Sequence, residues 1–213
     1  MGMEIGEEGQ APLVSALKEL SSRLGQDQAA WLLGGSCGLW LQGVPLEQSP
    51  RDIDVYCDRI DVEKLHDRLT SLALDEPVLD QSGSYASLLS HYRLGSFTME
   101  LVGGFEVRKG SSRYRTEVNG ILSEHSGRIA LEGSAIRLMP LAHELLFNVL
   151  RERPDRYHAI AEAIRRSPEP HLSLLHKLLA RNEWEAEMVI SVAELLDAPA
   201  IAEEWLQGPK QVK

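Results

Sequence analysis

Residues 29–57 read AAWLLGGSCGLWLQGVPLEQSPRDIDVYC, and this stretch decides the fold. A short apolar run, Ala29 to Leu33, breaks at a Gly-Gly-Ser turn and leads into a helix-like segment. After a loop, Arg51 to Cys57 alternates polar and apolar residues with the two-residue period of a strand. The order predicts strand, tight turn, helix, loop and strand, with Asp52 and Asp54 on one face of the second strand.

Patterns on either side extend this core. Upstream, four leucines recur with the 3.6-residue spacing of a helix that ends at Gly25. Downstream, Asp61 is the expected N-cap of the next helix. Residues 85–89 and 97–102 are two expected strands, joined by a hairpin turn at Gly95. The two aspartates are therefore expected to lie inside a larger sheet.

From about residue 139 the chain changes to helical patterns with leucine stripes, and two of these begin at a proline, which suits a first helical turn. The candidate helices are 140–150, 154–165, 171–180 and 184–196. The sequence predicts an α+β fold. A mixed β-sheet flanked by helices is expected in residues 1–138, followed by a C-terminal helical bundle in residues 139–213.

The charge of the chain bears on its partners. A formal net charge of -10 argues against a protein whose affinity comes from neutralising many phosphates, so a large nucleic acid is not expected as substrate. Residues 93–137, however, hold 7 basic and 5 acidic residues, a net charge of +2. Arg113 and Arg115 share one face of an expected hairpin there. They are either a solvated strand face or a phosphate contact.

Other features restrict the compartment. Residues 1–10 lack the positive and apolar regions of a secretory signal, and no apolar run approaches the roughly 18 residues of a membrane-spanning helix. We therefore expect a cytoplasmic protein without a membrane partner. Cys37 and Cys57 lack the spacing of a zinc or redox motif and are expected to be reduced core residues. His143 stays open between a structural role and a place at a cleft, and the oligomeric state also stays open.

Acidic side chains provide the candidate metal site. Alternate residues on a strand point the same way, about 6.5–7 Å apart, so Asp52 and Asp54 can hold hard cations while Ile53 is anchored in the core. A third carboxylate is expected from a neighbouring strand. Glu100 lies between apolar residues of the expected strand 97–102. Glu106, on the next segment, is the alternative. The expected cofactor is Mg²⁺, as two ions.

The turn before the first helix is a candidate phosphate site. Gly34, Gly35 and Ser36 offer backbone N–H groups, a hydroxyl and the positive end of a helix dipole. Glycine also allows phosphates to approach the backbone closely. Arg51, directly before the aspartates, is a further candidate contact to the ligand that carries these phosphates.

Three segments together, Leu32 to Ser36, Arg51 to Val55 and Met99 to Leu101, resemble the signature of the DNA polymerase β-like nucleotidyltransferase superfamily. That signature has Gly-Gly or Gly-Ser opening a helix, an Asp-apolar-Asp strand, and a later single carboxylate on a strand. The resemblance covers roughly residues 29–102, and a looser similarity follows within residues 141–156.

The resemblance implies roles for these residues. Gly35 and Ser36 would contact the triphosphate of a nucleotide, Asp52 and Asp54 would bind both magnesium ions, and Glu100 would be the third ligand or the base. The implied reaction moves a nucleoside monophosphate from a nucleoside triphosphate, with ATP as the first choice, to a hydroxyl of a small molecule or a protein. Pyrophosphate is released in this two-metal reaction.

Two alternatives bear on this function. The first segment is similar to that of tRNA CCA-adding enzymes, but Gly38 and Leu39 stand where an Arg-Asp pair is expected. Together with the acidic charge, this difference disfavours tRNA. The second alternative keeps the fold without turnover, as a nucleotide- or protein-binding module such as an antitoxin-like partner. It would be favoured if Glu100 pointed away from the aspartates.

Overall fold

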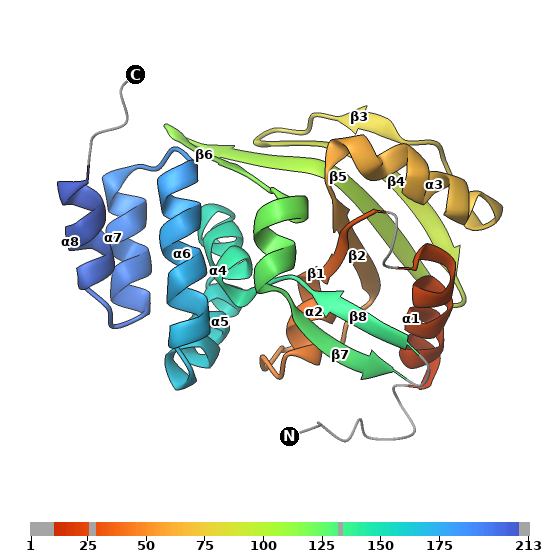
Figure 1. Ribbon diagram of the computed structural model, residues 1–213, viewed down its shortest axis with the longest axis horizontal. Helices are drawn as coiled ribbons and strands as arrows, with labels where there is room; N and C mark the ends of the chain where they lie inside the picture. The colour runs from red at the N-terminus through yellow and green to blue at the C-terminus, as the bar shows by residue number, and fades with distance from the viewer. Residues whose placement is uncertain (1–10, 26–28, 132–133, 209–213) are drawn as a thin grey trace.

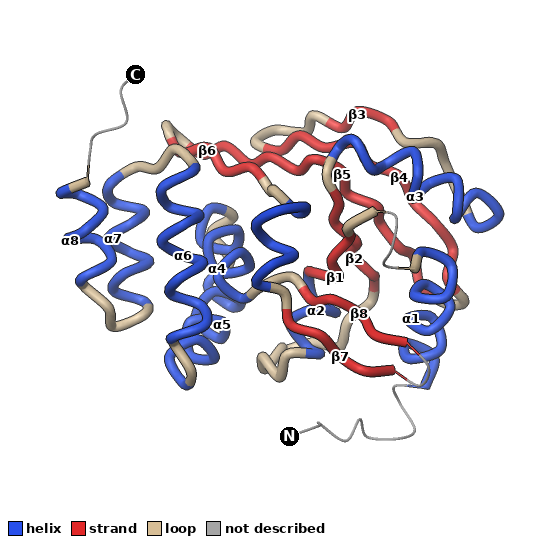
Figure 2. Tube along the Cα trace, in the orientation of Figure 1, coloured by secondary structure: helices blue, strands red, loops and turns tan. Residues whose placement is uncertain are grey.

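The computed structural model describes residues 11–25, 29–131 and 134–208. Its helices are α1 (Ala11–Leu24), α2 (Gly35–Leu41), α3 (Val62–Leu69), α4 (Leu141–Leu150), α5 (Pro154–Arg166), α6 (Glu169–Arg181), α7 (Ala186–Leu195) and α8 (Ala200–Gln207). Its strands are β1 (Trp31–Gly34), β2 (Asp52–Cys57), β3 (Val78–Asp80), β4 (Tyr85–Leu94), β5 (Phe97–Lys109), β6 (Ser112–Arg115), β7 (Gly127–Leu131) and β8 (Ser134–Leu138). The predicted α+β class, with a mixed sheet and a helical C-terminal region, is confirmed (Figure 2).

The strands form one mixed sheet in the order β3-β4-β5-β2-β1-β8-β7, and β6 pairs with β5 beside this path. Strand β2 lies in the middle, antiparallel to β1 and parallel to β5. The registers align Gly34, Asp54, Glu100 and His91 in one row across β1, β2, β5 and β4. Because residues directly opposite one another share a face, this row places the glycine turn and the acidic side chains together.

Strand β2 separates an apolar face from a polar one. Ile53 and Val55 are fully buried and belong to a hydrophobic cluster with leucines of α1 and α3. Asp52 and Asp54 alternate with them and point to the opposite face. The stripe of leucines on α1 is also buried in this cluster, which confirms the predicted opening helix. Packing of the apolar face therefore fixes the direction of both aspartates.

The C-terminal helices extend the other side of the core. Figure 1 shows α4–α8 gathered at one end of the molecule, away from α1 and α3. Helix α4 is buried along almost its whole length. One hydrophobic cluster joins Tyr56 and Phe105 of the sheet to Leu145 and Phe147 of this helix. The division between domains at residue 138 stays a prediction, and this cluster includes residues from both sides of it.

Some local expectations need correction. Helix α3 begins after Asp61 as expected, but among the described residues this side chain makes no capping hydrogen bond, and it lies 3.4 Å from the Nζ atom of Lys64. Strands β3, β7 and β8 and helix α8 were not expected from the sequence. Strand β8 extends the sheet beyond β1, because Leu33 pairs with Leu138 in parallel register. Within the described residues, no helix is long and apolar enough to cross a membrane.

Candidate active site

A cavity of about 390 Å³ lies over the polar face of the sheet. The three predicted carboxylates, Asp52, Asp54 and Glu100, line it together with Gly35 and Ser36. Glu100 is directly opposite Asp54 in the β2–β5 register, so it does not point away from the aspartates. Five residues that are separated by up to 65 positions in sequence therefore meet in one cavity.

Two other predicted contacts lie outside this lining. Gly34 forms the end of β1 opposite Asp54, and a Cβ atom there would lie 2.8 Å from the ring of Tyr56. Arg51 is exposed, directly before β2. Neither is among the described residues that line the cavity. The structure therefore gives Gly34 a packing role and leaves Arg51 beside the site.

The glycine turn is built around a carboxylate. Gly35 has a φ of +58°, and a Cβ atom at this position would lie 1.8 Å from Oδ2 of Asp54. The hydroxyl of Ser36 donates a hydrogen bond to Oδ1 of Asp52 at 3.3 Å. Glycine is therefore required here by the close approach of Asp54 as well as by the left-handed backbone.

A buried glutamate of α4 holds the same turn by a hydrogen bond. Glu144 on α4 is 1% exposed, and its Oε1 accepts a hydrogen bond from the Gly35 N–H at 2.9 Å. In this structure that N–H therefore serves the protein itself, whereas the sequence interpretation reserved it for phosphate. The side chain of Asn148 lies 3.4 Å from the other Glu144 oxygen as a second donor. Sequence reasoning missed this role because Glu144 is 109 residues from Gly35.

Burial raises the pKa of three acidic side chains at the cavity. Burial, then the charges of Asp52, Glu100 and Glu144, raises the pKa of Asp54 to about 8, although Arg151 opposes the shift. Burial also raises the pKa of Glu144 to about 7, against the Gly35 hydrogen bond and the charge of Arg151. The pKa of Glu100 is likewise raised by burial. The cavity thus concentrates negative charge that a cation would neutralise.

These carboxylates fit magnesium in donor type and charge, since hard cations prefer oxygen ligands. Within the described residues, no group of three His, Cys, Asp or Glu side chains converges closely enough to form a ready-made metal-binding group. Asp52, Asp54 and Glu100 therefore line the cavity without meeting at one point. A cation bound there would draw the three carboxylates together, because it would replace their mutual repulsion by attraction.

Arginine side chains from the junction of α4 and α5 bring positive charge to the cavity. Arg151, Arg153 and Arg156 all line it. The guanidinium of Arg151 lies 4.8 Å from the ring centroid of Phe147 and 5.8 Å from that of Tyr85. Sequence reasoning did not assign these arginines. The run RERPDR at residues 151–156 was a usable signal, because it places three arginines after the expected end of a helix.

The arginines that the sequence suggested have another role. Arg113 and Arg115 donate hydrogen bonds to Oε2 of Glu106 at 2.9 and 2.6 Å, and Arg108 donates to its Oε1 at 2.6 Å. Burial opposes ionisation, but these hydrogen bonds lower the pKa of Glu106 to about 2. None of these residues is among the described ones that line the cavity. The phosphate interpretation of Arg113 and Arg115 is therefore wrong for this cavity, and Glu100 lies with the aspartates where Glu106 does not.

We expect Glu106→Gln to lower stability without affecting the cavity. A depressed pKa stabilises the fold above about pH 4.5, and this contribution is lost as the pH falls toward 2. The variant should lose about 1–3 kcal/mol of unfolding free energy at pH 7, and the difference from wild type should shrink below pH 4.5. Urea unfolding at pH 7 and pH 3 measures this. An equal loss at both pH values would contradict the ion-pair explanation.

Other candidates from the sequence are interior residues. Cys37 and Cys57 are buried thiols, as expected. His143 is fully buried and its Nδ1 lies 2.6 Å from the hydroxyl of Tyr114. Burial lowers the pKa of His143 to about 3, so the ring is neutral. The alternative that placed His143 at a cleft is wrong, because α4 turns this side chain into the core.

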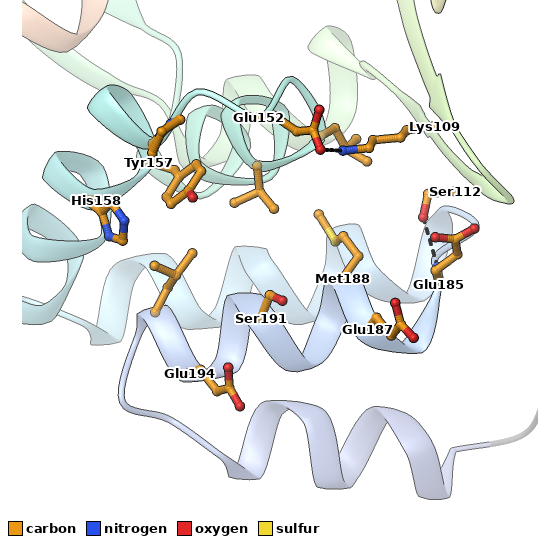
Figure 3. A pocket seen from close by; sticks show the side chains of 14 residues that line it. Lys109, Ser112, Glu152, Tyr157, His158, Glu185, Glu187, Met188, Ser191 and Glu194 are labelled. Carbon is orange, nitrogen blue, oxygen red and sulfur yellow. Dashed lines mark hydrogen bonds and ion pairs between the residues drawn. The ribbon is translucent and has the colours of Figure 1, made fainter.

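A larger cavity, of about 770 Å³, lies between the α4–α5 junction and α7 (Figure 3). At one end Lys109 and Glu152 form an ion pair of 2.6 Å, and the hydroxyl of Ser112 accepts a hydrogen bond from the backbone N–H of Glu185. None of the predicted site residues is among the described residues that line it. If cavity volume alone were the criterion, the larger cavity would be chosen. The chemistry of the carboxylates instead identifies the smaller cavity as the candidate active site.

The comparisons with known proteins agree with this fold. The chain matches no protein-family model and no curated protein. Among solved structures it is similar to a candidate nucleotidyltransferase from Thermotoga maritima, with a TM-score of 0.58 and 18% identity over 75% of this chain and 94% of that one. It is also similar to the antibiotic-resistance factor ANT(2'')-Ia, with a TM-score of 0.50 and 10% identity over 81% and 94%.

At such identities the likeness concerns the fold. The chain shares the fold of these two structures, which agrees with the fold that the resemblance of its three sequence segments implied.

Proposed function

We propose that this protein is a magnesium-dependent nucleotidyltransferase that uses ATP as its first-choice donor. The observation that carries the proposal is the meeting of Asp52, Asp54 and Glu100 in one cavity that also receives three arginines. Carboxylates alone would suit a cation, and arginines alone would suit an anion. Their combination suits a metal-bound triphosphate, whose charges both sets can balance.

The donor nucleotide is assigned to the side of the cavity formed by α2 and the α4–α5 junction. Ser36 is in the first turn of α2, and its hydroxyl can turn from Asp52 to a phosphate oxygen. Arg151, Arg153 and Arg156 can balance the charge of the triphosphate. Arg153 is held by Asp155 through two hydrogen bonds of 3.0 and 2.7 Å, so its direction is fixed.

Transfer would proceed on the carboxylate side. Asp52, Asp54 and Glu100 would hold magnesium, which when bound offsets the charge on the attacking and leaving oxygens. Glu100 would accept the proton of the acceptor hydroxyl. The acceptor oxygen forms a bond to the α-phosphorus, the bond from that phosphorus to the bridging oxygen breaks, and pyrophosphate leaves.

We propose a small molecule with a hydroxyl group as the acceptor, with a protein hydroxyl as the alternative. The acidic net charge of -10 disfavours long polyanionic acceptors. ANT(2'')-Ia, which shares the fold, is an antibiotic-resistance factor. Hydroxylated antibiotics are therefore sensible first probes.

The proposal is tested by melting-temperature shifts with ATP, GTP, CTP and UTP, each with magnesium or with EDTA. A ligand that binds the native state alone raises its stability, so a magnesium-dependent shift with at least one nucleotide is expected. Pyrophosphate release is then measured with a panel of hydroxylated small molecules and with water as acceptor. Nucleotide binding without any release would favour the binding module, and no shift with any nucleotide would overturn the proposal.

We expect Arg151→Met to weaken ATP binding about tenfold, because the change removes a charge-assisted contact and keeps an unbranched side-chain stem. Arg166→Met is the matched control, since Arg166 is paired with Glu162 on the surface of α5. Titration calorimetry with magnesium and a non-hydrolysable ATP analogue measures both. Equal affinities for the two variants would remove Arg151 from the nucleotide site.

A further inference from the structure

The row of aligned residues in the sheet does not stop at Glu100. One strand further, His91 on β4 is directly opposite Glu100 on β5. Its Nε2 lies 3.9 Å from Oε1 of Glu100, and both side chains are about one third exposed. The row thus runs from Gly34 through Asp54 and Glu100 to His91. His91 is not itself among the described residues that line the cavity, and it lies next to the cavity through its proximity to Glu100.

A second carboxylate fixes this histidine. Oδ1 of Asp75 accepts a hydrogen bond from the His91 backbone N–H at 2.6 Å, and Oδ2 lies 2.7 Å from its Nδ1. The Leu74 N–H donates to the His91 carbonyl at 2.8 Å, so Asp75 is itself held at the edge of β4. Because an ionised carboxylate can only accept, Nδ1 carries a proton and donates it. The ring is therefore oriented with Nε2 toward Glu100.

His91 and Glu100 are close enough for one ligand oxygen to contact both side chains. At 3.9 Å the two side chains are too far apart for a direct hydrogen bond. An oxygen that lies beside the line joining the two atoms, about 2.8 Å from each, can contact both at once. The glycine turn and Ser36 are at the other end of the row, toward β1 and α2. His91 is therefore on the side of Glu100 that faces away from the proposed donor nucleotide.

We propose that His91, oriented by Asp75, positions the acceptor hydroxyl beside Glu100. This inference rests on the proposed function and adds the acceptor side of the same site. The hydroxyl oxygen accepts a hydrogen bond from Nε2–H of His91 and donates its own proton to the Glu100 carboxylate, from beside the line that joins the two groups. Its proton passes to Glu100 as the oxygen bonds to the α-phosphorus and pyrophosphate leaves. His91 directs a lone pair of the oxygen toward phosphorus, in the way that an orienting group prepares a nucleophile.

The test compares His91→Leu, His91→Gln and Asp75→Asn with wild type. ATP and magnesium should shift the melting temperature of all four proteins, with affinities within about twofold, because the donor side is untouched. Pyrophosphate release, with water or the best acceptor of the panel, should fall about 100-fold in His91→Leu. His91→Gln should recover part of this loss. Asp75→Asn should lose about tenfold, because the ring is less well oriented.

His176→Leu is the matched control. It removes a half-exposed histidine of α6, whose Nδ1 lies 3.7 Å from Oε2 of Glu204 on α8. Its kinetics should equal those of wild type. Unchanged turnover and acceptor KM in His91→Leu would overturn the role of His91 while leaving the proposed function intact. Loss of the ATP shift in His91→Leu would also overturn the role of His91 on the acceptor side, since the substitution would then affect donor binding or the fold. No release by wild type with any acceptor would overturn the proposed function and this inference together.

Discussion

Asp54→Asn should abolish magnesium-dependent ATP binding and at the same time make the ligand-free protein more stable at pH 8. The substitution removes one of the two aspartates of the proposed metal site with almost no change in volume. It also removes a charge that burial and the neighbouring Asp52, Glu100 and Glu144 disfavour. The expected gain is about 1–3 kcal/mol of unfolding free energy, less than the full pKa shift implies because Asp54 is partly exposed.

The pH dependence gives this prediction its sign. The folded protein holds the Asp54 proton up to about pH 8, whereas an unfolded aspartate loses it near pH 4. At this group the folded state therefore binds more protons between these values, and the contribution of Asp54 to wild-type stability falls as the pH rises from 4 to 8. Asp54→Asn lacks this proton. Its advantage over wild type should be largest at pH 8 and small at pH 4, without magnesium.

Urea unfolding at pH 5 and pH 8 measures the stability, and a melting shift with magnesium and ATP measures the binding. Asp58→Asn is the matched control. Asp58 follows the same strand, and its carboxylate accepts hydrogen bonds from the N–H groups of Val118 and Asn119 at 2.9 and 2.8 Å. That variant should lose stability and keep ATP binding. If Asp54→Asn instead unfolded, Asp54 would be a structural residue, and if it kept its ATP shift, Asp54 would not be a residue of the metal site.

Gly35→Ala should destroy the site. The new Cβ atom would lie 1.8 Å from Oδ2 of Asp54, so the turn or the carboxylate must move. The left-handed φ of +58° adds about 1 kcal/mol of backbone strain for alanine. Overpacking adds about 1–3 kcal/mol more. We therefore expect a total loss of about 2–4 kcal/mol of unfolding free energy and no measurable magnesium-dependent ATP shift.

Gly95→Ala separates the two contributions. Gly95 has almost the same φ, +57°, but an added Cβ would meet no described atom within 4 Å. This variant should lose only the backbone contribution, about 1 kcal/mol, and bind ATP as wild type does. Urea unfolding and the ATP melting shift measure both variants. Equal losses in the two would show that contact with Asp54 is not what requires glycine at position 35.

Local sequence patterns were sufficient where a segment carries its own structural information. The Gly-Gly-Ser turn, the alternation in residues 51–57 and the leucine stripes predicted the α1, β1–α2–β2 and α4–α7 segments correctly. These patterns work because each depends on the period of one element and on whether its residues meet water or the core. Strands β7 and β8 were missed because pairing across the sheet, rather than a clear local pattern, makes them strands.

In the candidate site, too, the sequence predicted some features and the tertiary structure decided others. By itself, the sequence determined that Asp52 and Asp54 share a face, because a strand has a period of two. It left Glu100 and Glu106 as alternatives, and it left Arg113 and Arg115 open between a solvated strand face and a phosphate contact. Only the tertiary structure decided these points. The β2–β5 register puts Glu100 opposite Asp54, and three arginines form ion pairs with Glu106. The C-terminal helices bring Glu144 and Arg151 to the cavity. Such contacts depend on the packing of segments that are distant in the chain, and no local period encodes that packing.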